Sequence, residues 1–331
     1  MPGRPPVSLP GVRRHRLTIL SLLFLLVALS GCSSGGGKGG SAAKSGSVTT
    51  STAPGATPPS VTVTAKEYRF TLPPEIEGGV VRLTLQNDGK LKHEAVIVAA
   101  GATPLARLKR DLTPVVKGDE KPTPGYLHFQ GGVSLVPGGT SAVSTLALPA
   151  GKYVMVCTLT DADSLEESAG PPPAKADRFH FDLGMAVPFT VKTTTTAVMA
   201  PTDGTIVGRD WSFEVPALAP GTRTLTFRND GEQDHSLAVS EFADGIDAGA
   251  AKAAFGTLLA ADADHPPPDD LPTADDVAFA GPLSAGGQAT FTVALKPNRT
   301  YVFACYMSDR AGGPLHAKGK GMVAYATAPP G

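Results

Sequence analysis

Apolar and polar positions alternate along most of the chain from residue 61 onward. In residues 61–66 valine or alanine alternates with threonine or lysine, and residues 80–85 form a second run rich in valine and leucine. Period-two alternation places successive side chains on opposite faces of a strand, and β-branched residues favour strands. Short runs of this kind, separated by turns rich in glycine and proline, continue almost to the C-terminus. The pattern predicts an all-β protein.

The strand pattern occurs twice. Residues 83–89 read LTLQNDG and residues 225–231 read LTFRNDG, and YVMVC at 153–157 matches YVFAC at 301–305. Each copy covers about 130 residues, an ordinary length for one domain. We therefore predict two tandem Greek-key β-sandwich domains joined by a short linker, at residues 61–192, 205–328 and 193–204 respectively.

Each repeat also contains one segment that predicts a helix. Thr103 and Pro104 are typical of an N-cap and a first-turn proline, for a helix that ends near residue 112. In the second repeat Asp247 can cap an alanine-rich helix over residues 248–260. We expect both helices to be short insertions in the sandwiches.

The N-terminal segment has the pattern of an export signal. Four arginines precede an apolar run of 13 residues at 17–29, too short to span a bilayer core of roughly 30 Å. The sequence then reads Leu29-Ser30-Gly31-Cys32, which resembles the lipobox of bacterial lipoproteins. The resemblance implies cleavage after residue 31 and lipidation of Cys32, which would anchor the protein to the extracytoplasmic face of the cell membrane. A plain secretory signal with an incidental cysteine is the alternative.

Composition adds a tether and excludes one class of partner. Residues 32–60 consist mostly of Gly, Ser, Thr and Pro and predict a flexible tether with a reach on the order of 30 Å. Loss of the four arginines from 29 basic residues, against 30 acidic ones, leaves a net charge of −5. A mildly acidic protein has no electrostatic footprint for nucleic acid, so we expect no nucleic-acid partner.

Candidate chemistry recurs in the same order in both repeats. Asn-Asp-Gly is followed by a histidine and much later by a cysteine, a histidine and a methionine, namely His93, Cys157, His180 and Met185, then His235, Cys305, His316 and Met322. Two imidazoles, a thiolate and a thioether form the ligand set of blue-copper electron-transfer sites. Because Cys157 and Cys305 lie in strands of different domains, we expect no disulfide between them.

Both repeats resemble the cupredoxin family, the class of plastocyanin and azurin, over nearly all of residues 61–327. The resemblance implies copper, at most one per domain, bound by the eight residues above, and one-electron transfer to a redox partner protein without enzymatic activity. The sequence departs from the family in two ways. The step from Cys157 to His180 is 23 residues, and the asparagine that usually follows the first histidine is replaced by Glu94 and Ser236. A serine there could still donate a hydrogen bond.

Two alternatives to electron transfer stay open at this point. One is a metal-free sandwich that serves as a binding or scaffold module, since buried Cys and Met are ordinary core residues. The other is copper storage or delivery. His128 and His265 are expected to be a strand or loop residue and a solvated residue, and the sequence has no His-X-His pair of the kind that multicopper oxidases use.

Overall fold

The structure is a computed structural model that describes residues 57–164, 177–194, 197–261, 265–268 and 270–331. The predicted signal peptide, Cys32 and nearly all of the predicted tether lie outside these ranges. Among the described residues, no helix is long and apolar enough to cross a membrane.

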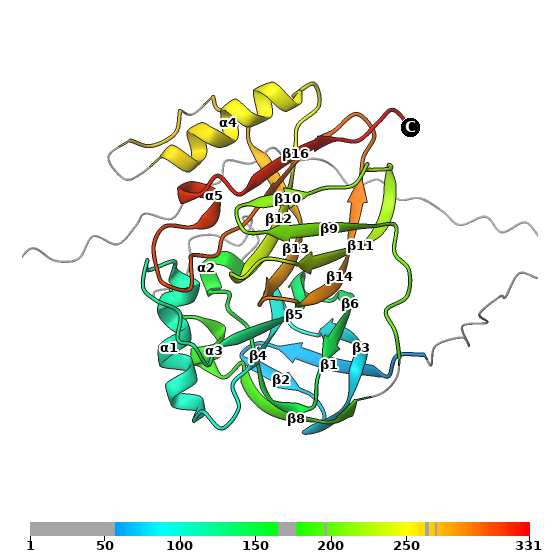
Figure 1. The fold of residues 1–331 in the computed structure, drawn as a ribbon, viewed down its shortest axis with the longest axis vertical. Helices are drawn as coiled ribbons and strands as arrows, with labels where there is room; N and C mark the ends of the chain where they lie inside the picture. The colour runs from blue at the N-terminus through cyan, green and yellow to red at the C-terminus, as the bar shows by residue number, and fades with distance from the viewer. Residues whose placement is uncertain (1–56, 165–176, 195–196, 262–264, 269) are drawn as a thin grey trace, which may run out of the picture.

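The first repeat is built from strands that lie in two layers (Figure 1). Its strands are β1 (Ser60–Lys66), β2 (Arg69–Thr71), β3 (Glu75–Asn87), β4 (His93–Ala99), β5 (His128–Val136), β6 (Ser141–Leu148), β7 (Gly151–Val156) and β8 (Ala186–Thr194). One layer contains β1, β3 and β6, and the other contains β8, β7, β4 and β5. The long strand β3 contributes to both layers because its first residues pair with β8 and the rest pairs with β6.

The second repeat has the same arrangement. Its strands are β9 (Gly204–Arg209), β10 (Ser212–Glu214), β11 (Gly221–Asn229), β12 (His235–Phe242), β13 (Ala274–Leu283), β14 (Gln288–Leu295), β15 (Thr300–Ala304) and β16 (Val323–Thr327). In each repeat the first strand pairs in parallel with the third strand, β1 with β3 and β9 with β11. The prediction of an all-β fold with two tandem Greek-key sandwiches is confirmed.

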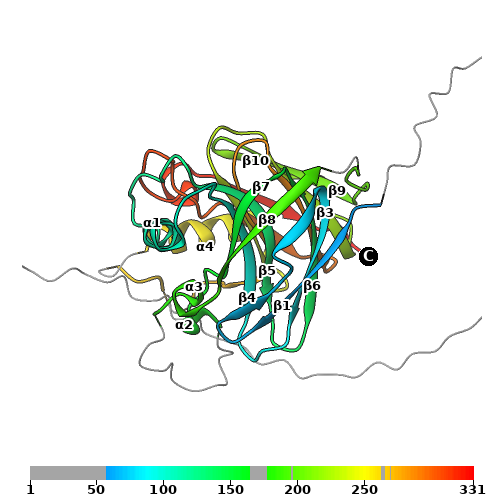
Figure 2. The same cartoon turned by 90° about the horizontal axis from the view of Figure 1, so that it is seen from below.

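The two sandwiches are joined to each other by strand pairing in both layers. One layer passes from β6 to β14 through the pair Leu146 and Ala289, and the other passes from β5 to β13 through Gln130 and Leu283. Figure 1 shows the second repeat stacked above the first, and Figure 2 shows the first repeat from below. The largest apolar cluster likewise draws on both repeats, with Leu85, Ile97, Phe189, Phe227, Leu283 and Phe303 among its members.

Strands occupy both ends of the predicted linker. Strand β8 extends to Thr194 and β9 begins at Gly204, so the ends of the predicted linker at 193–204 belong to strands. Thr193 and Thr194 continue strand β8, because threonine is itself a good strand residue.

Both predicted helices are present. Helix α1 (Leu105–Lys117) follows Pro104, and it continues five residues beyond the predicted end, past Pro114. Helix α4 (Ala248–Ala260) has the predicted bounds, and Asp247 Oδ1 accepts a hydrogen bond of 2.8 Å from Ala250 N. The described residues also contain one-turn helices that four residues of sequence cannot reveal by periodicity, namely α2 (Asp161–Ser164), α3 (His180–Leu183) and α5 (His316–Gly319).

Candidate metal centres

Equivalent elements carry the candidate ligands in the two repeats. The first histidine opens β4 or β12, and the cysteine directly follows β7 or β15. The second histidine opens α3 or α5, and the methionine directly precedes β8 or β16. Figure 1 shows α3 and α5 on the same side of the molecule as α1.

In the first repeat two histidines and the cysteine converge. Nδ1 of His93 lies 3.2 Å from Nδ1 of His180, and Cys157 Sγ lies 3.4 Å from His180 Nδ1 and 3.9 Å from His93 Nδ1. All three side chains are fully buried. We call this group the first centre.

The second repeat reproduces the group almost exactly in distance. Nδ1 of His235 lies 3.2 Å from Nδ1 of His316, and Cys305 Sγ lies 3.6 Å and 3.4 Å from these two atoms respectively. In each repeat the three donor atoms lie within 4.8 Å of one another. We call this group the second centre.

The methionines are tied to the same loops through the backbone. Cys157 N donates to Met185 O at 3.1 Å, and Met185 N donates to His180 O at 2.9 Å. The corresponding bonds of the second repeat join Cys305 to Met322 and Met322 to His316, at 3.2 Å and 3.0 Å. Both methionines are fully buried. Their role as axial ligands stays a prediction.

The Asn-Asp-Gly motif positions the first histidine. Buried Asn87 donates through Nδ2 to Leu91 O and Val136 O, both at 2.8 Å, and its Oδ1 accepts from Gly89 N at 2.9 Å. These bonds fix the turn that leads into His93. Asn229 makes the equivalent bonds with Gln233 O, Leu283 O and Gly231 N.

A short bridge explains how unequal spacings give equal geometry. Thr160 pairs with Phe179, and Ser308 pairs with Leu315, so each ligand loop is closed three residues after its cysteine and one residue before its histidine. The bridged residues are 19 positions apart in the first repeat and 7 in the second. The difference of 12 equals the whole difference between the two Cys-to-His steps of 23 and 11 residues. All the extra residues of the first repeat therefore lie between the two bridged residues in the sequence.

The residue after the first histidine supports the cysteine loop in both repeats. Glu94 Oε1 accepts from the backbone N of Thr158 at 3.1 Å and from the Thr158 hydroxyl, and Ser236 Oγ accepts from Tyr306 N at 3.2 Å. The Ser236 hydroxyl also hydrogen-bonds the Cys305 side chain and lowers the pKa of that thiol, as the expected donated bond would. The backbone N of Glu94 and of Ser236 also donates to the cysteine Sγ, at 3.5 Å and 3.4 Å.

Sequence reasoning missed the carboxylates that face the outer ring nitrogens. His180 Nε2 lies 3.1 Å from Asp161 Oδ1, and His235 Nε2 lies 3.0 Å from Asp210 Oδ1. His316 Nε2 lies 3.1 Å from Asp309 Oδ1. The repeat carried a signal for two of them, because Asp161 and Asp309 each follow their cysteine by four residues.

One aromatic ring packs edge-on against the histidines of each centre. Tyr68 lies 5.5 Å from His180 between ring centroids, and Trp211 lies 4.9 Å from His316. Both residues have positive φ, 59° and 72°, in the tight turn after β1 or β9. This backbone conformation is uncommon outside glycine. The matched turns aim both rings at the centres, and the Tyr68 hydroxyl also donates to Asp161.

The electrostatics of both centres favour neutral imidazoles facing a cation. Burial lowers the pKa of His93 and of His316 to about 4, and the neighbouring histidine, His180 or His235 respectively, lowers it further. Burial raises the pKa of the Cys157 thiol well above its usual range and that of Cys305 to about 11. Each thiol would release its proton to solvent on binding a metal ion.

The donor set fits a copper ion. A carboxylate at Nε2 places the ring proton there and leaves the Nδ1 lone pair free, the usual arrangement for a metal-bound histidine. His180 and His235 make such a hydrogen bond, whereas Nε2 of His93 and of His316 has no hydrogen-bond partner among the described residues. In each centre the two Nδ1 atoms lie 3.2 Å apart beside the cysteine sulfur. Nitrogen and soft sulfur donors in this number suit copper.

The two centres predict an acid-sensitive fold. We expect His93 and His316 to destabilise the metal-free protein as the pH falls from about 6.5 to about 4. In this window the unfolded histidines bind protons and the folded ones do not, so the unfolded state gains. Burial raises the pKa of Glu94, so at pH values above the ordinary glutamate pKa the folded state binds this proton more readily than the unfolded state. Glu94 therefore stabilises the fold as the pH falls, opposite to the two histidines.

Urea unfolding at pH 7 and pH 5 separates these contributions. His93→Gln and His316→Gln should each reduce the acid-induced loss of stability, whereas the exposed His128→Gln should leave it unchanged. Equal pH dependence in all three variants and the parent would contradict the account.

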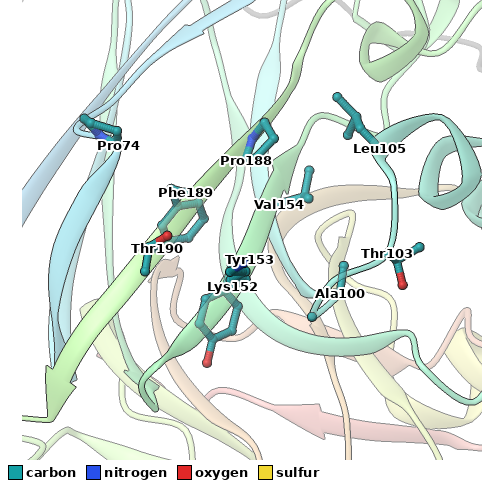
Figure 3. A pocket seen from close by; sticks show the side chains of 11 residues that line it. Pro74, Ala100, Thr103, Leu105, Lys152, Tyr153, Val154, Pro188, Phe189 and Thr190 are labelled. Atoms are coloured by element: carbon teal, nitrogen blue, oxygen red, sulfur yellow. The ribbon is translucent and has the colours of Figure 1, made fainter.

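The remaining sequence-based candidates lie away from the centres. His128 opens β5 and His265 lies in a bend, and both are exposed. Cys157 and Cys305 are free and buried, as expected. A hollow of about 190 Å³ in the first repeat lies between α1 and the β7–β8 edge, where Tyr153 and Phe189 line it (Figure 3). None of the eight predicted ligands lines it.

Comparison with known proteins gives structural neighbours only. No protein-family model matches the sequence, and no curated protein matches it. The dithionite-reduced auracyanin of Roseiflexus castenholzii is 25% identical, with a TM-score of 0.25, over 38% of this chain and 96% of that chain. Auracyanin B is 21% identical, with a TM-score of 0.24, over 40% and 94%. Auracyanin A of Chloroflexus aurantiacus, a "blue" copper protein, is 24% identical, with a TM-score of 0.20, over 30% and 83%.

Proposed function

We propose that this protein is a copper protein that transfers single electrons at two centres, one in each sandwich. The observation that carries the proposal is the repeated convergence of two histidine Nδ1 atoms and one cysteine Sγ within 4.8 Å, in fully buried positions. Copper bound there would supply one-electron exchange between Cu(I) and Cu(II), for which this donor set with a weak thioether is suited.

The chain's own contribution is to hold the donor atoms in one geometry. Asp161 and Asp210 orient a histidine in each centre, and the bridges Thr160–Phe179 and Ser308–Leu315 close the ligand loops. Backbone N–H groups of Glu94 and Ser236 point at the cysteine sulfurs and would stabilise negative charge on them. Burial of the ligands excludes water. A fixed, dry donor set favours electron exchange over ligand exchange.

Reversible reduction tests this function. Cu(II) added to the purified mature protein should produce an intense visible band that ascorbate bleaches and an oxidant restores, with copper retained through gel filtration. Release of copper on reduction would favour storage or delivery instead. The convergence of donor atoms in both repeats counts against the metal-free scaffold.

The proposal includes an extracytoplasmic location, supported by the export-signal pattern and the Leu29-Ser30-Gly31-Cys32 sequence. Lipid on Cys32 would hold both sandwiches at the outer face of the membrane on a flexible tether, within reach of a redox partner protein. In cells the protein should pellet with membranes and be released by detergent. Cys32→Ser should move it to the soluble fraction, and a membrane-bound Cys32→Ser protein would contradict the anchor.

A further inference from the structure

The ligand loop of the second centre, residues 306–315, rests on the first sandwich. The segment of the first repeat that it contacts is the connection between α1 and β5, residues 118–127. Thr123 N donates to Arg310 O at 2.9 Å, and Gly313 N donates to Glu120 O at 3.0 Å. A β-carbon at Gly312 would lie 2.7 Å from Glu120 O, so the two backbones are in close contact.

Arg310 is the centre of this contact. Its Nη2 donates to Leu127 O at 3.0 Å and to Pro124 O at 3.3 Å, both in the first repeat. Its Nη1 pairs with Asp234, whose side chain is only 2% exposed. Asp234 directly precedes His235, a predicted ligand of the second centre. One guanidinium therefore joins the ligand loop, the first histidine's strand and the other sandwich.

Further bonds extend the contact on both sides of Arg310. Its backbone N donates to Gln233 Oε1 at 2.8 Å. Asp234 Oδ1 accepts from Ser284 Oγ at 2.6 Å, and Ser284 Oγ accepts in turn from Phe129 N at 2.9 Å. The side chain of Met307 packs against the first repeat's cluster around α1, and its carbonyl accepts from His316 N at 2.7 Å. Both histidines of the second centre are thus connected to the first sandwich.

Among the described residues, which leave out 165–176 of its loop, the first centre has no corresponding anchor. Ala162 occupies the position five residues after Cys157, where the second repeat has Arg310 five residues after Cys305. Its methyl group can neither pair with a carboxylate nor donate to carbonyls. The two centres match in donor geometry and differ in what holds their loops.

We propose that Arg310 is a positioning residue through which the first sandwich holds the ligand loop of the second centre. Copper binding at His235, Cys305 and His316 then depends on the contact between the sandwiches, and binding at the first centre does not. The copper-binding test of this inference rests on the proposed function, whereas its hydrogen-exchange test on the metal-free chain does not.

The copper experiment isolates each centre in the full chain. Cys157→Ser leaves only the second centre, and Cys305→Ser leaves only the first. In the Cys157→Ser background Arg310→Ala should weaken Cu(II) binding by about tenfold or more, measured by chelator competition, and should shift the visible and EPR spectra. In the Cys305→Ser background it should leave both unchanged. Arg310→Lys keeps the charge beside Asp234 but not the planar fork, so it should restore part of the affinity.

Arg299→Ala is the matched control. Its side chain is 22% exposed, the same fraction as that of Arg310, and it faces the carboxylates of Glu241 and Asp244 at the opposite end of β15 from Cys305. Both substitutions remove an arginine from an ion pair in the second repeat. A merely structural role would give both variants the same effect on copper.

Hydrogen exchange of the metal-free full chain gives the second readout. Arg310→Ala should speed exchange at Gly313 and His316 relative to the parent, while Phe181 in the first centre's loop stays protected. Gly312→Ala, which retains the arginine but forces the loop away from Glu120, should do the same and serves if Arg310→Ala fails to fold.

The outcomes separate the two claims. If neither the Cys157→Ser nor the Cys305→Ser protein binds copper while Arg310 is intact, the proposed function is contradicted. The hydrogen-exchange data then decide the inference alone. A parent that binds copper, with spectra, affinity and exchange unchanged in Arg310→Ala, overturns the inference and leaves the proposed function intact. Equal weakening of both centres, or equal effects of Arg299→Ala, also overturns it.

Discussion

Cys157→Ser is expected to remove about half of the visible thiolate-to-copper absorption of the copper-loaded protein, and Cys305→Ser the other half. Each Sγ lies within 3.9 Å of both Nδ1 atoms of its centre, and a serine oxygen in its place gives no thiolate transition. The double variant should be colourless. Absorption spectra recorded at equal protein concentration and saturating Cu(II) measure the effect.

Each single variant controls the other, because it retains one intact centre in an otherwise identical chain. Copper content should be measured alongside, since a serine centre can retain copper without colour. An unchanged band in both single variants would contradict the assignment of these thiols as ligands. Loss of the whole band in one single variant would show that only the centre altered in that variant forms a coloured copper site.

Asn87→Leu is expected to lower the free energy of unfolding by roughly 3 kcal/mol, from the loss of its three hydrogen bonds inside the fold. Leucine has a similar volume, but it leaves Leu91 O, Val136 O and Gly89 N without the partner they have in the parent. Urea unfolding of the metal-free protein measures the change. The same substitution should also weaken copper binding at the first centre, because the turn it fixes leads into His93.

Asp88→Ala is the control for this variant, since Asp88 is the exposed neighbour in the same motif and its side chain makes one exposed bond with Gln86. We expect a change within about 0.5 kcal/mol there. Comparable losses in the two variants would contradict the role given to the buried amide.

The sequence was sufficient to predict the class of fold and to single out the two histidines and one cysteine that lie together in each repeat. Duplication made the ligand order visible, because His93 and Cys157 had counterparts at His235 and Cys305 in matching strands. The N-cap Asp247 likewise sits in a local signal that needs no tertiary information. Patterns of this kind depend on neighbours along the chain, and sequence reasoning reads them directly.

What the sequence did not predict depends on contacts between distant segments. The step of 23 residues from Cys157 to His180 departs from the family pattern, and only the structure shows that the Thr160–Phe179 bridge closes this ligand loop. Glu94 departed from the family residue yet accepts from the backbone after the cysteine, because an acceptor is what that position requires.

The contact between the sandwiches was also invisible in sequence. Arg310 and Leu127 are separated by 183 residues, and the strand pairs that join the layers are single residues wide. Neither the Arg310–Leu127 contact nor these strand pairs produce a periodic pattern in the sequence. The repeat is uninformative here because Ala162 occupies the position in the first copy that corresponds to Arg310.

Copper content of the purified mature protein, measured by elemental analysis together with its visible spectrum, tests the central claim most directly. The account predicts two copper ions per chain at saturation and an intense visible band that is lost on reduction. A colourless protein without bound copper at neutral pH would contradict it.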